Sequence, residues 1–278
     1  MKIFNILIIF FISTISIFTQ SYNELLEKGN SYFVLENYES SISAYTKAIL
    51  LKPTEPNAYY NRGLAFRKVE KYSLSVDDFS KAIEYLSFDL NILKWAYYYR
   101  GSSYLTIKDD QANTLKWKSV SDFTSSLNID PNLFIAYYDR GNAYTQLGEN
   151  IKALIDFNNA ELLDPNEPNV KRIRGRVYQA IGEYDKAIQD YTFALQYFPT
   201  ESRTYYNRGS VFLLMDNYNS ALADINKAIS LFSYDADYFY NRGMVYYKLN
   251  NIDSAKKDWE KAIELKPELK PELEEYLK

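Results

Sequence analysis

One short motif, in most copies an arginine followed by a glycine, recurs along the chain at a nearly constant interval. Its glycines are Gly29, Gly63, Gly101, Gly141, Gly175, Gly209 and Gly243. The steps between them are 34, 38, 40, 34, 34 and 34 residues. A fixed step of this size is typical of a solenoid, in which one supersecondary unit is stacked many times.

Within each unit, small and apolar residues follow the period of an α-helix. In the first unit, Leu25 and Gly29 share one helical stripe, and Tyr45 and Ala48 share a second one. A short polar break separates the two stripes, and Pro53 ends the second helix. Each unit is therefore predicted to be a pair of helices, A and B.

The residues at these positions resemble the tetratricopeptide repeat (TPR) family. Repeat four carries the family pattern in Tyr137, Gly141, Tyr144, Ala153, Phe157, Ala160 and Pro165. The resemblance covers residues 22–267 and implies an all-α TPR solenoid, a right-handed superhelix of seven antiparallel helix pairs plus a C-terminal capping helix. The implied repeats are 22–55, 56–93, 94–133, 134–167, 168–201, 202–235 and 236–267, followed by the cap at 268–278.

Two units are longer than 34 residues. Repeat two has four extra residues around 86–94, which predict a longer helix B or a longer linker. Repeat three has six extra residues between Tyr104 and Phe123, which predict an enlarged turn between helices A and B.

Residues 1–20 differ from the repeats. Lys2 is their only charged side chain, and an apolar run of about 16 residues follows it, fewer than the roughly 20 that span a bilayer. This arrangement predicts a secretory signal peptide, and hence a mature chain without a membrane span that is secreted, periplasmic or in the cell envelope. The alternative is an uncleaved N-terminal anchor.

Composition excludes several classes of function. The chain has neither cysteine nor histidine, which removes disulfides, Cys/His zinc sites, thiol nucleophiles and Ser-His dyads. Its formal net charge of −4 lacks the basic bias of a nucleic-acid-binding protein. We therefore expect no enzymatic activity, no cofactor and no nucleic-acid partner.

Arginine at position 7 and aspartate at position 23 occur together in six repeats. The pairs are Arg62 and Asp78, Arg100 and Asp122, Arg140 and Asp156, Arg174 and Asp190, Arg208 and Asp224, and Arg242 and Asp258. Repeat one has Lys28 and Ala44 instead, so both partners are missing from the same unit. This co-occurrence predicts a structural ion pair between helices A and B of each unit. An arginine ladder that binds anions is the alternative.

The resemblance implies that positions 2, 5, 6, 9, 12 and 13 line a concave groove. Position 5 carries Tyr60, Tyr98, Tyr138, Tyr206 and Tyr240. Tyrosine combines a flat apolar face with a hydroxyl, which suits an extended peptide or a glycan. Alternatively, these rings pack on neighbouring A helices.

Repeat five interrupts the tyrosine series with Arg172 and Arg176, and Arg203 of repeat six is expected close by. In chaperone co-factor adaptors of the resembled family, the positions of Arg172, Arg176 and Asn207 clamp a carboxylate. Asp237 stands where that clamp has a cation, so the match is partial. The alternatives are a pocket for an acidic residue or a solvated basic face.

The resemblance implies a non-catalytic scaffold or adaptor that binds a partner protein or peptide in the concave groove. Two alternatives remain from the sequence. One is a structural component of an envelope complex, and the other is a glycan-binding module that uses the groove tyrosines.

Overall fold

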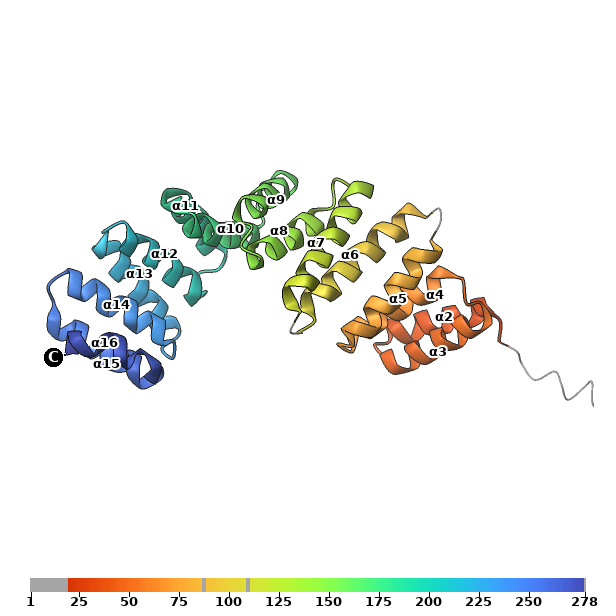
Figure 1. Cartoon of the computed structure of the whole chain (residues 1–278), viewed down its shortest axis with the longest axis horizontal. Helices are drawn as coiled ribbons and strands as arrows, with labels where there is room; N and C mark the ends of the chain where they lie inside the picture. The colour runs from red at the N-terminus through yellow and green to blue at the C-terminus, as the bar shows by residue number, and fades with distance from the viewer. Residues whose placement is uncertain (1–19, 87–88, 109–110, 278) are drawn as a thin grey trace, which may run out of the picture. The chain divides into compact units, whose positions relative to one another are not determined.

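The computed structural model describes residues 20–86, 89–108 and 111–277. The regular secondary structure of these residues is helical, with no β-strand among them (Figure 1). The predicted signal peptide lies outside this range, except for Gln20. Among the helices that are described, none is long and apolar enough to cross a membrane.

The chain divides into two compact units, and the division falls between Ala136 and Tyr137, near the start of α8. The helices up to α8 are α2 (Tyr22–Val34), α3 (Tyr38–Leu51), α4 (Pro56–Lys68), α5 (Tyr72–Tyr85), α6 (Leu90–Thr106), α7 (Ala112–Ile129) and α8 (Phe134–Gln146). They are followed by α9 (Asn150–Leu163), α10 (Pro168–Ala180), α11 (Tyr184–Tyr197), α12 (Ser202–Leu214), α13 (Tyr218–Leu231), α14 (Ala236–Lys248), α15 (Ile252–Leu265), the 3₁₀ turn η1 (Pro267–Leu269) and α16 (Lys270–Leu277).

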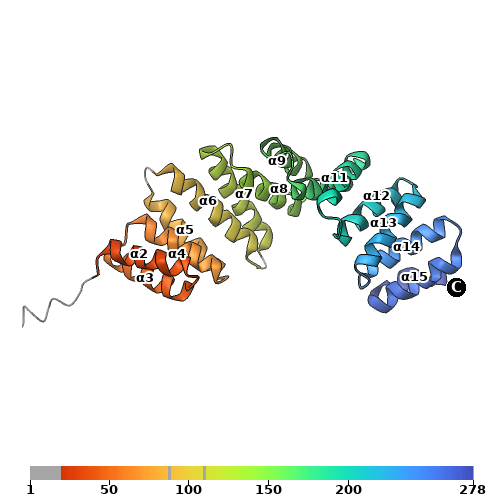
Figure 2. The same ribbon diagram turned by 180° about the vertical axis from the view of Figure 1, so that it is seen from behind.

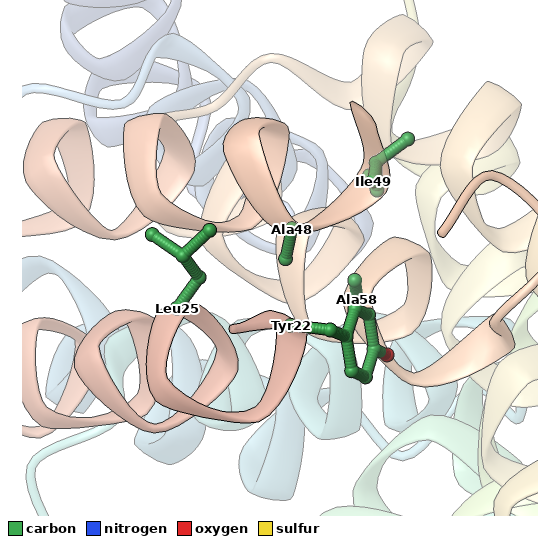
Figure 3. Packing of buried hydrophobic residues seen from close by; sticks show 5 residues of the cluster. All are labelled: Tyr22, Leu25, Ala48, Ile49 and Ala58. Carbon is green, nitrogen blue, oxygen red and sulfur yellow. The ribbon is translucent and has the colours of Figure 1, made fainter. Parts of the chain in front are cut away.

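In the first unit, consecutive helices contact one another from α2 to α7 (Figure 2). The two helices of a pair approach closely because position 8 is glycine. A Cβ atom on Gly29 would lie 2.4 Å from the ring of Tyr45, which is closer than atoms can pack. Successive pairs share a core, because Tyr22, Leu25, Ala48, Ile49 and Ala58 of α2, α3 and α4 form one buried cluster (Figure 3).

The extra residues of repeats two and three lengthen helices rather than loops. The prediction of a longer helix B or a longer linker in repeat two is wrong. Helix α5 has 14 residues, as α3 does, and the connections 52–55 and 86–89 are equally long, so the added residues lengthen α6, which has 17 residues where α4 has 13. Asp89 instead caps the N-terminus of α6 by accepting hydrogen bonds from the amides of Asn91 and Ile92. In repeat three, α7 has 18 residues where α5 has 14, so most of the predicted turn enlargement is one more turn of helix B.

In the second unit, α10 to α15 stack in the same order, and α16 covers the end of the stack. Leu273 of α16 is fully buried against Ala255 and Trp259 of α15. The predicted capping segment therefore contains a helix, preceded by a 3₁₀ turn that begins at Pro267.

The six arginines at position 7 contact the aspartates of their own repeats, as the sequence predicts. Each arginine donates from Nε and Nη2 to the two carboxylate oxygens, at 2.7–2.8 Å. Burial raises the pKa of Asp156 above its ordinary value of 3.8, and the hydrogen bonds from Arg140 only partly offset this. The carboxylate is thus strongly desolvated and depends on its arginine.

The arginines also bind the preceding repeat, a contact that the sequence analysis did not predict. The Nη1 donors and their acceptors are Arg62 with Thr46, Arg100 with Ser80, Arg174 with Asn158, Arg208 with Thr192, and Arg242 with Asn226, at 2.8–3.1 Å. Every acceptor stands at position 25 of its repeat. Each of these guanidinium groups therefore links helix B of its own repeat to helix B of the preceding repeat.

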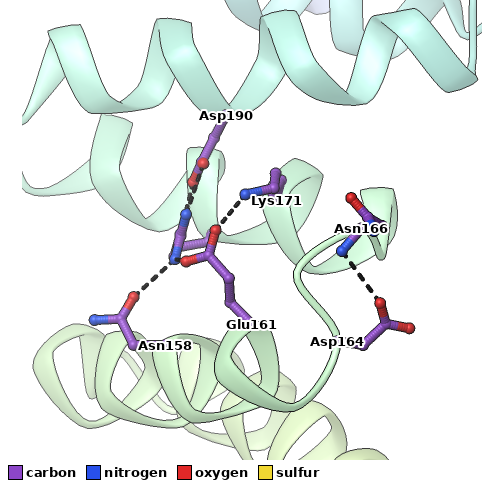
Figure 4. A network of polar contacts seen from close by, with 7 residues as sticks. Asn158, Glu161, Asp164, Asn166, Lys171 and Asp190 are labelled. Carbon is purple, nitrogen blue, oxygen red and sulfur yellow. Dashed lines mark hydrogen bonds and ion pairs between the residues drawn. The ribbon is translucent and has the colours of Figure 1, made fainter.

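The junction of repeats four and five carries an additional charged network (Figure 4). Glu161 of α9 accepts hydrogen bonds from Lys171 and Arg174 of α10, and Arg174 also binds Asp190. Burial would raise the pKa of Glu161, but the bonds from Arg174 and Lys171 outweigh it and hold the pKa below its ordinary value of 4.5.

This network replaces an apolar contact. The other repeats have an aliphatic residue at the position of Glu161, namely Ile49, Ile83, Leu127, Leu195, Ile229 and Ile263. At the position of Lys171 they have Leu25, Tyr59, Tyr97, Tyr137, Tyr205 and Phe239. Both sides of the junction between α9 and α10 have therefore exchanged an apolar side chain for a charged one.

Candidate functional site

Five of the residues that the sequence singles out for the groove line one pocket in the second unit. The pocket has a volume of about 290 Å³. It is lined by Arg172 and Arg176 of α10, Arg203, Tyr206 and Asn207 of α12, and Asp237 of α14. Three helices A contribute to it, so the stacking of repeats five, six and seven creates the site.

Helix α10 supplies two guanidinium groups without a carboxylate partner. Arg172 and Arg176 are one helical turn apart and therefore share a face of α10. Arg172 donates a 3.3 Å hydrogen bond to Asn169. In the part of the chain that the structure describes, no carboxylate lies within ion-pair distance of Arg172 or Arg176, and Arg176 is exposed. These two cations are available to an anionic ligand.

The α12 side of the pocket is more rigid. Arg203 forms an ion pair with Asp235 at 2.9 Å and lies over the ring of Tyr206. Tyr206 stacks on Tyr238 with ring centroids 4.7 Å apart, and its hydroxyl accepts a hydrogen bond from Asn241. Burial raises the pKa of Tyr206 to about 12, so its hydroxyl stays protonated at neutral pH and can act as a hydrogen-bond donor.

Asp237 is the lining residue that sequence reasoning did not include. It is the second residue of repeat seven and adds a carboxylate to a pocket that three arginines also line. The formal charge of the lining is +3 − 1 = +2. The sequence signal was present, because Asp237 stands at position 2, which the family resemblance assigns to the groove, and departs from the cation expected there.

The other four tyrosines at position 5 do not line this pocket, and their rings are half-buried. Tyr60 packs on Phe79, and Tyr98 packs on Phe123. Tyr138 packs on Phe157.

Tyr240 donates from its hydroxyl to Glu272 of α16, at 2.5 Å, and burial together with Glu272 raises its pKa to about 12. These contacts favour the packing alternative for Tyr60, Tyr98, Tyr138 and Tyr240. Tyr206 is the tyrosine of this set that has a place in the pocket.

Taken together, the lining residues can bind but have no evident means of bond-breaking chemistry. Two unpaired guanidinium groups and the amide of Asn207 point to an oxygen anion as ligand, because planar guanidinium donors match a carboxylate. The raised pKa of Tyr206 makes it a poor general base.

Sequence models of one family match much of the chain. Models described as "Tetratricopeptide repeat" match residues 135–167, 174–236 and 236–269. A model described as "TPR repeat" matches residues 29–70. Proteins with these repeats generally mediate protein–protein interactions.

Individual relatives resemble parts of the chain. Dynein axonemal assembly factor 4 from Pongo pygmaeus is 31% identical over 119 residues, which are 41% of this chain and 27% of that protein. The chain thus spans about a quarter of the length of this curated relative.

Two solved structures share the fold. The C-terminal part of a TPR repeat-containing protein from Cytophaga hutchinsonii has a TM-score of 0.70 at 18% identity, covering 91% of this chain and 99% of that one. YrrB, described as a TPR protein with an unusual peptide-binding site, has a TM-score of 0.58 at 22% identity, covering 68% of this chain and 93% of its own. The helix pairs, the family models and these structures agree, and the chain belongs to the tetratricopeptide repeat family.

Proposed function

We propose that this chain is a non-catalytic scaffold that holds a partner protein by an acidic side chain in the pocket between α10, α12 and α14. The observation that carries the proposal is the pair Arg172 and Arg176, two cations on one helical face with no carboxylate of the described chain in ion-pair distance. A cation that the fold leaves unneutralised is free to contribute to binding rather than to stability.

Two further features support this function. Asn207 lines the pocket beside the arginines and adds an uncharged donor that can orient a carboxylate. YrrB, whose fold this chain shares, is described as having a peptide-binding site. A peptide ligand agrees with a pocket that is open to solvent and formed by three stacked repeats.

Reversing both charges in the variant Arg172→Glu/Arg176→Glu is expected to lower the affinity for an acidic peptide at least tenfold, as the loss of two charge-assisted contacts requires. The probe is a seven-residue Gly/Ser peptide with one central glutamate and blocked ends. Binding is followed by NMR titration of the full chain.

The matched control is Lys152→Glu/Lys186→Glu, which changes the net charge by the same amount at two exposed lysines outside the pocket. The affinity of this control variant for the acidic peptide is expected to stay within about twofold of the wild-type value, because screened surface charges act weakly at a distance. Equal losses in both double variants would show that general charge, and not the pocket, attracts the peptide.

We further propose that the mature chain works outside the cytoplasm. The support is the sequence of residues 1–20, in which Lys2 precedes an apolar run too short to span a bilayer. Expression of the full-length chain in a secretion-competent host, followed by intact-mass measurement of the exported protein, is expected to show removal of about 20 residues. Recovery of the uncut chain from the cytoplasm would contradict export, and recovery of the uncut chain from membranes would support the anchor.

A further inference from the structure

We propose that the site selects a partner segment in which one acidic residue is next to an aromatic or other large apolar residue, and that it discriminates against runs of acidic residues. The inference rests on the proposed function, because it specifies which acidic segment the pocket binds. Three observations carry it: a second pocket, an exposed aromatic pair, and the charge of Asp237.

A second pocket adjoins the first and shares Asp237 with it. Its volume is about 280 Å³. It is lined by Phe232, Tyr234, Asp235, Ala236, Asp237, Leu265 and Lys266. A bound segment that passes Asp237 therefore moves from the arginines of α10 and α12 to a surface with two aromatic rings and a leucine.

Phe232 and Tyr234 are unusually exposed for aromatic side chains. They are 48% and 77% exposed, and their rings contact each other edge to face at 6.1 Å. They lie in the connection between α13 and α14. In the sequence, repeat two has Phe88 at the position of Tyr234, whereas the counterparts in repeats one, three, four and five are polar. Those counterparts are Thr54, Asn132, Asn166 and Thr200.

A paired, solvent-exposed aromatic surface beside a charged pocket is typical of a recognition site, since aromatic anchors dominate binding energy. The two rings have no role in the buried clusters of the described chain. We therefore infer that the two rings contact the ligand. The group on a ligand that complements them is a large apolar side chain.

Asp237 limits the number of acidic groups that a ligand can carry. Asp235 is already neutralised by Arg203, at 2.9 Å. Among the residues that the structure describes, the cation within ion-pair distance of Asp237 is Lys266, at 3.8 Å; the two side chains are 45% and 50% exposed, respectively, and such solvated pairs are weak. A second carboxylate of the ligand would face the charge of Asp237, which repels it.

The consequence is a division of the site at Asp237. The arginine side accepts one anionic group, and the aromatic side accepts an apolar group. A run of acidic residues would extend past the arginines towards Asp237 and would lose affinity there. Electrostatic attraction alone would predict the opposite, namely that affinity rises with each added glutamate.

The test compares four blocked peptides by NMR titration of the full chain. Two contain one glutamate next to one phenylalanine, in either order, within Gly/Ser residues. The third is the single-glutamate peptide, and the fourth is hexaglutamate. We expect one of the Glu/Phe orders to bind about fivefold or more tighter than the single-glutamate peptide, and hexaglutamate to bind no tighter than the single-glutamate peptide.

Two variants assign these differences to residues. Phe232→Ser/Tyr234→Ser, which alters exposed side chains and should leave folding intact, is expected to remove the advantage of the Glu/Phe peptide without affecting the single-glutamate peptide. Asp237→Lys is expected to raise the affinity for hexaglutamate about tenfold. Circular dichroism of each variant confirms that the fold is retained.

The outcomes separate the two proposals. If none of the four peptides binds the wild-type chain, or binding survives Arg172→Glu/Arg176→Glu, the proposed function fails. If binding depends on those arginines but hexaglutamate binds tightest and phenylalanine adds nothing, the selectivity is refuted while the proposed function stands. A Glu/Phe advantage that persists in Phe232→Ser/Tyr234→Ser also overturns the assignment of the aromatic surface.

Discussion

Replacing Asp224 with alanine is expected to lower the free energy of unfolding by about 3 kcal/mol, because it leaves the guanidinium of Arg208 in a largely desolvated position without its counter-charge. The side chains of Arg208 and Asp224 are only 18% and 10% exposed. Urea denaturation followed by far-UV circular dichroism measures the loss.

A double-mutant cycle tests whether the pair acts as one unit. Arg208→Ala should cost about as much as Asp224→Ala, and the double variant should cost little more than either, which gives a coupling energy of about 2–3 kcal/mol. The hydrogen bond from Arg208 to the hydroxyl of Thr192 is more exposed, so Thr192→Val should lower the free energy of unfolding by only about 0.5 kcal/mol. Additive losses at Arg208 and Asp224 would show that the ion pair is not the source of the stability.

Replacing Trp259 with alanine is expected to have the larger effect, about 3–5 kcal/mol, because it empties the centre of the last repeat. Trp259 is fully buried, contacts Tyr247 and Tyr276, and packs with Leu273 of the capping helix. The loss should also release α16, so hydrogen exchange at the amides of Lys270–Leu277 should accelerate more than exchange in α12.

The matched control is Trp259→Phe. Repeats two, three and four have Phe79, Phe123 and Phe157 at this position, so phenylalanine fits the geometry of the helix pair. This variant should lose no more than about half as much stability, and α16 should remain protected. Equal exchange rates at α16 in the two variants would indicate that the cap is held by something other than the indole.

Much of the fold could be predicted from sequence because the same residue pattern recurs in every repeat and specifies the same helix pair each time. Glycine at position 8 requires a close approach of helices A and B, and the contact of Gly243 with Trp259 shows why: a Cβ atom would lie 2.5 Å from the indole nitrogen. The absence of both an arginine and an aspartate from repeat one indicated pairing within a unit. These inferences needed only spacing and co-occurrence.

What could not be predicted depends on contacts between repeats or on competing local signals. The sequence analysis places the extra residues of repeat two in helix B or in the linker, whereas they belong to α6, because Asp89 is an N-cap and a cap decides which helix gains the following residues. The acceptors at position 25 were missed because serine, threonine and asparagine on a helix surface are ordinarily solvated.

The candidate pocket was predicted in part. Arg172 and Arg176 share a helical face by their spacing alone, and Arg203 and Asn207 follow from the repeat register. Asp237 stands at a predicted groove position but is not among the predicted site residues, and the sequence pattern does not single out the aromatic pair at Phe232 and Tyr234. Both lie beside the connection between α13 and α14, where the family pattern specifies little.

The exchange of apolar for charged side chains between repeats four and five has a consequence during folding. Because the seven repeats are similar, one helix pair can stack on a repeat that is not its native neighbour, a misfolding event typical of repeat proteins. If repeat four skipped ahead to repeat six, Glu161 would meet the ring of Tyr205 in place of Lys171 and would lose one of its two cations, because only the arginine at position 7, here Arg208, would remain. Lys171 would in turn lose Glu161 as its acceptor, so the charged contact between α9 and α10 favours the pairing of repeat four with repeat five over other pairings.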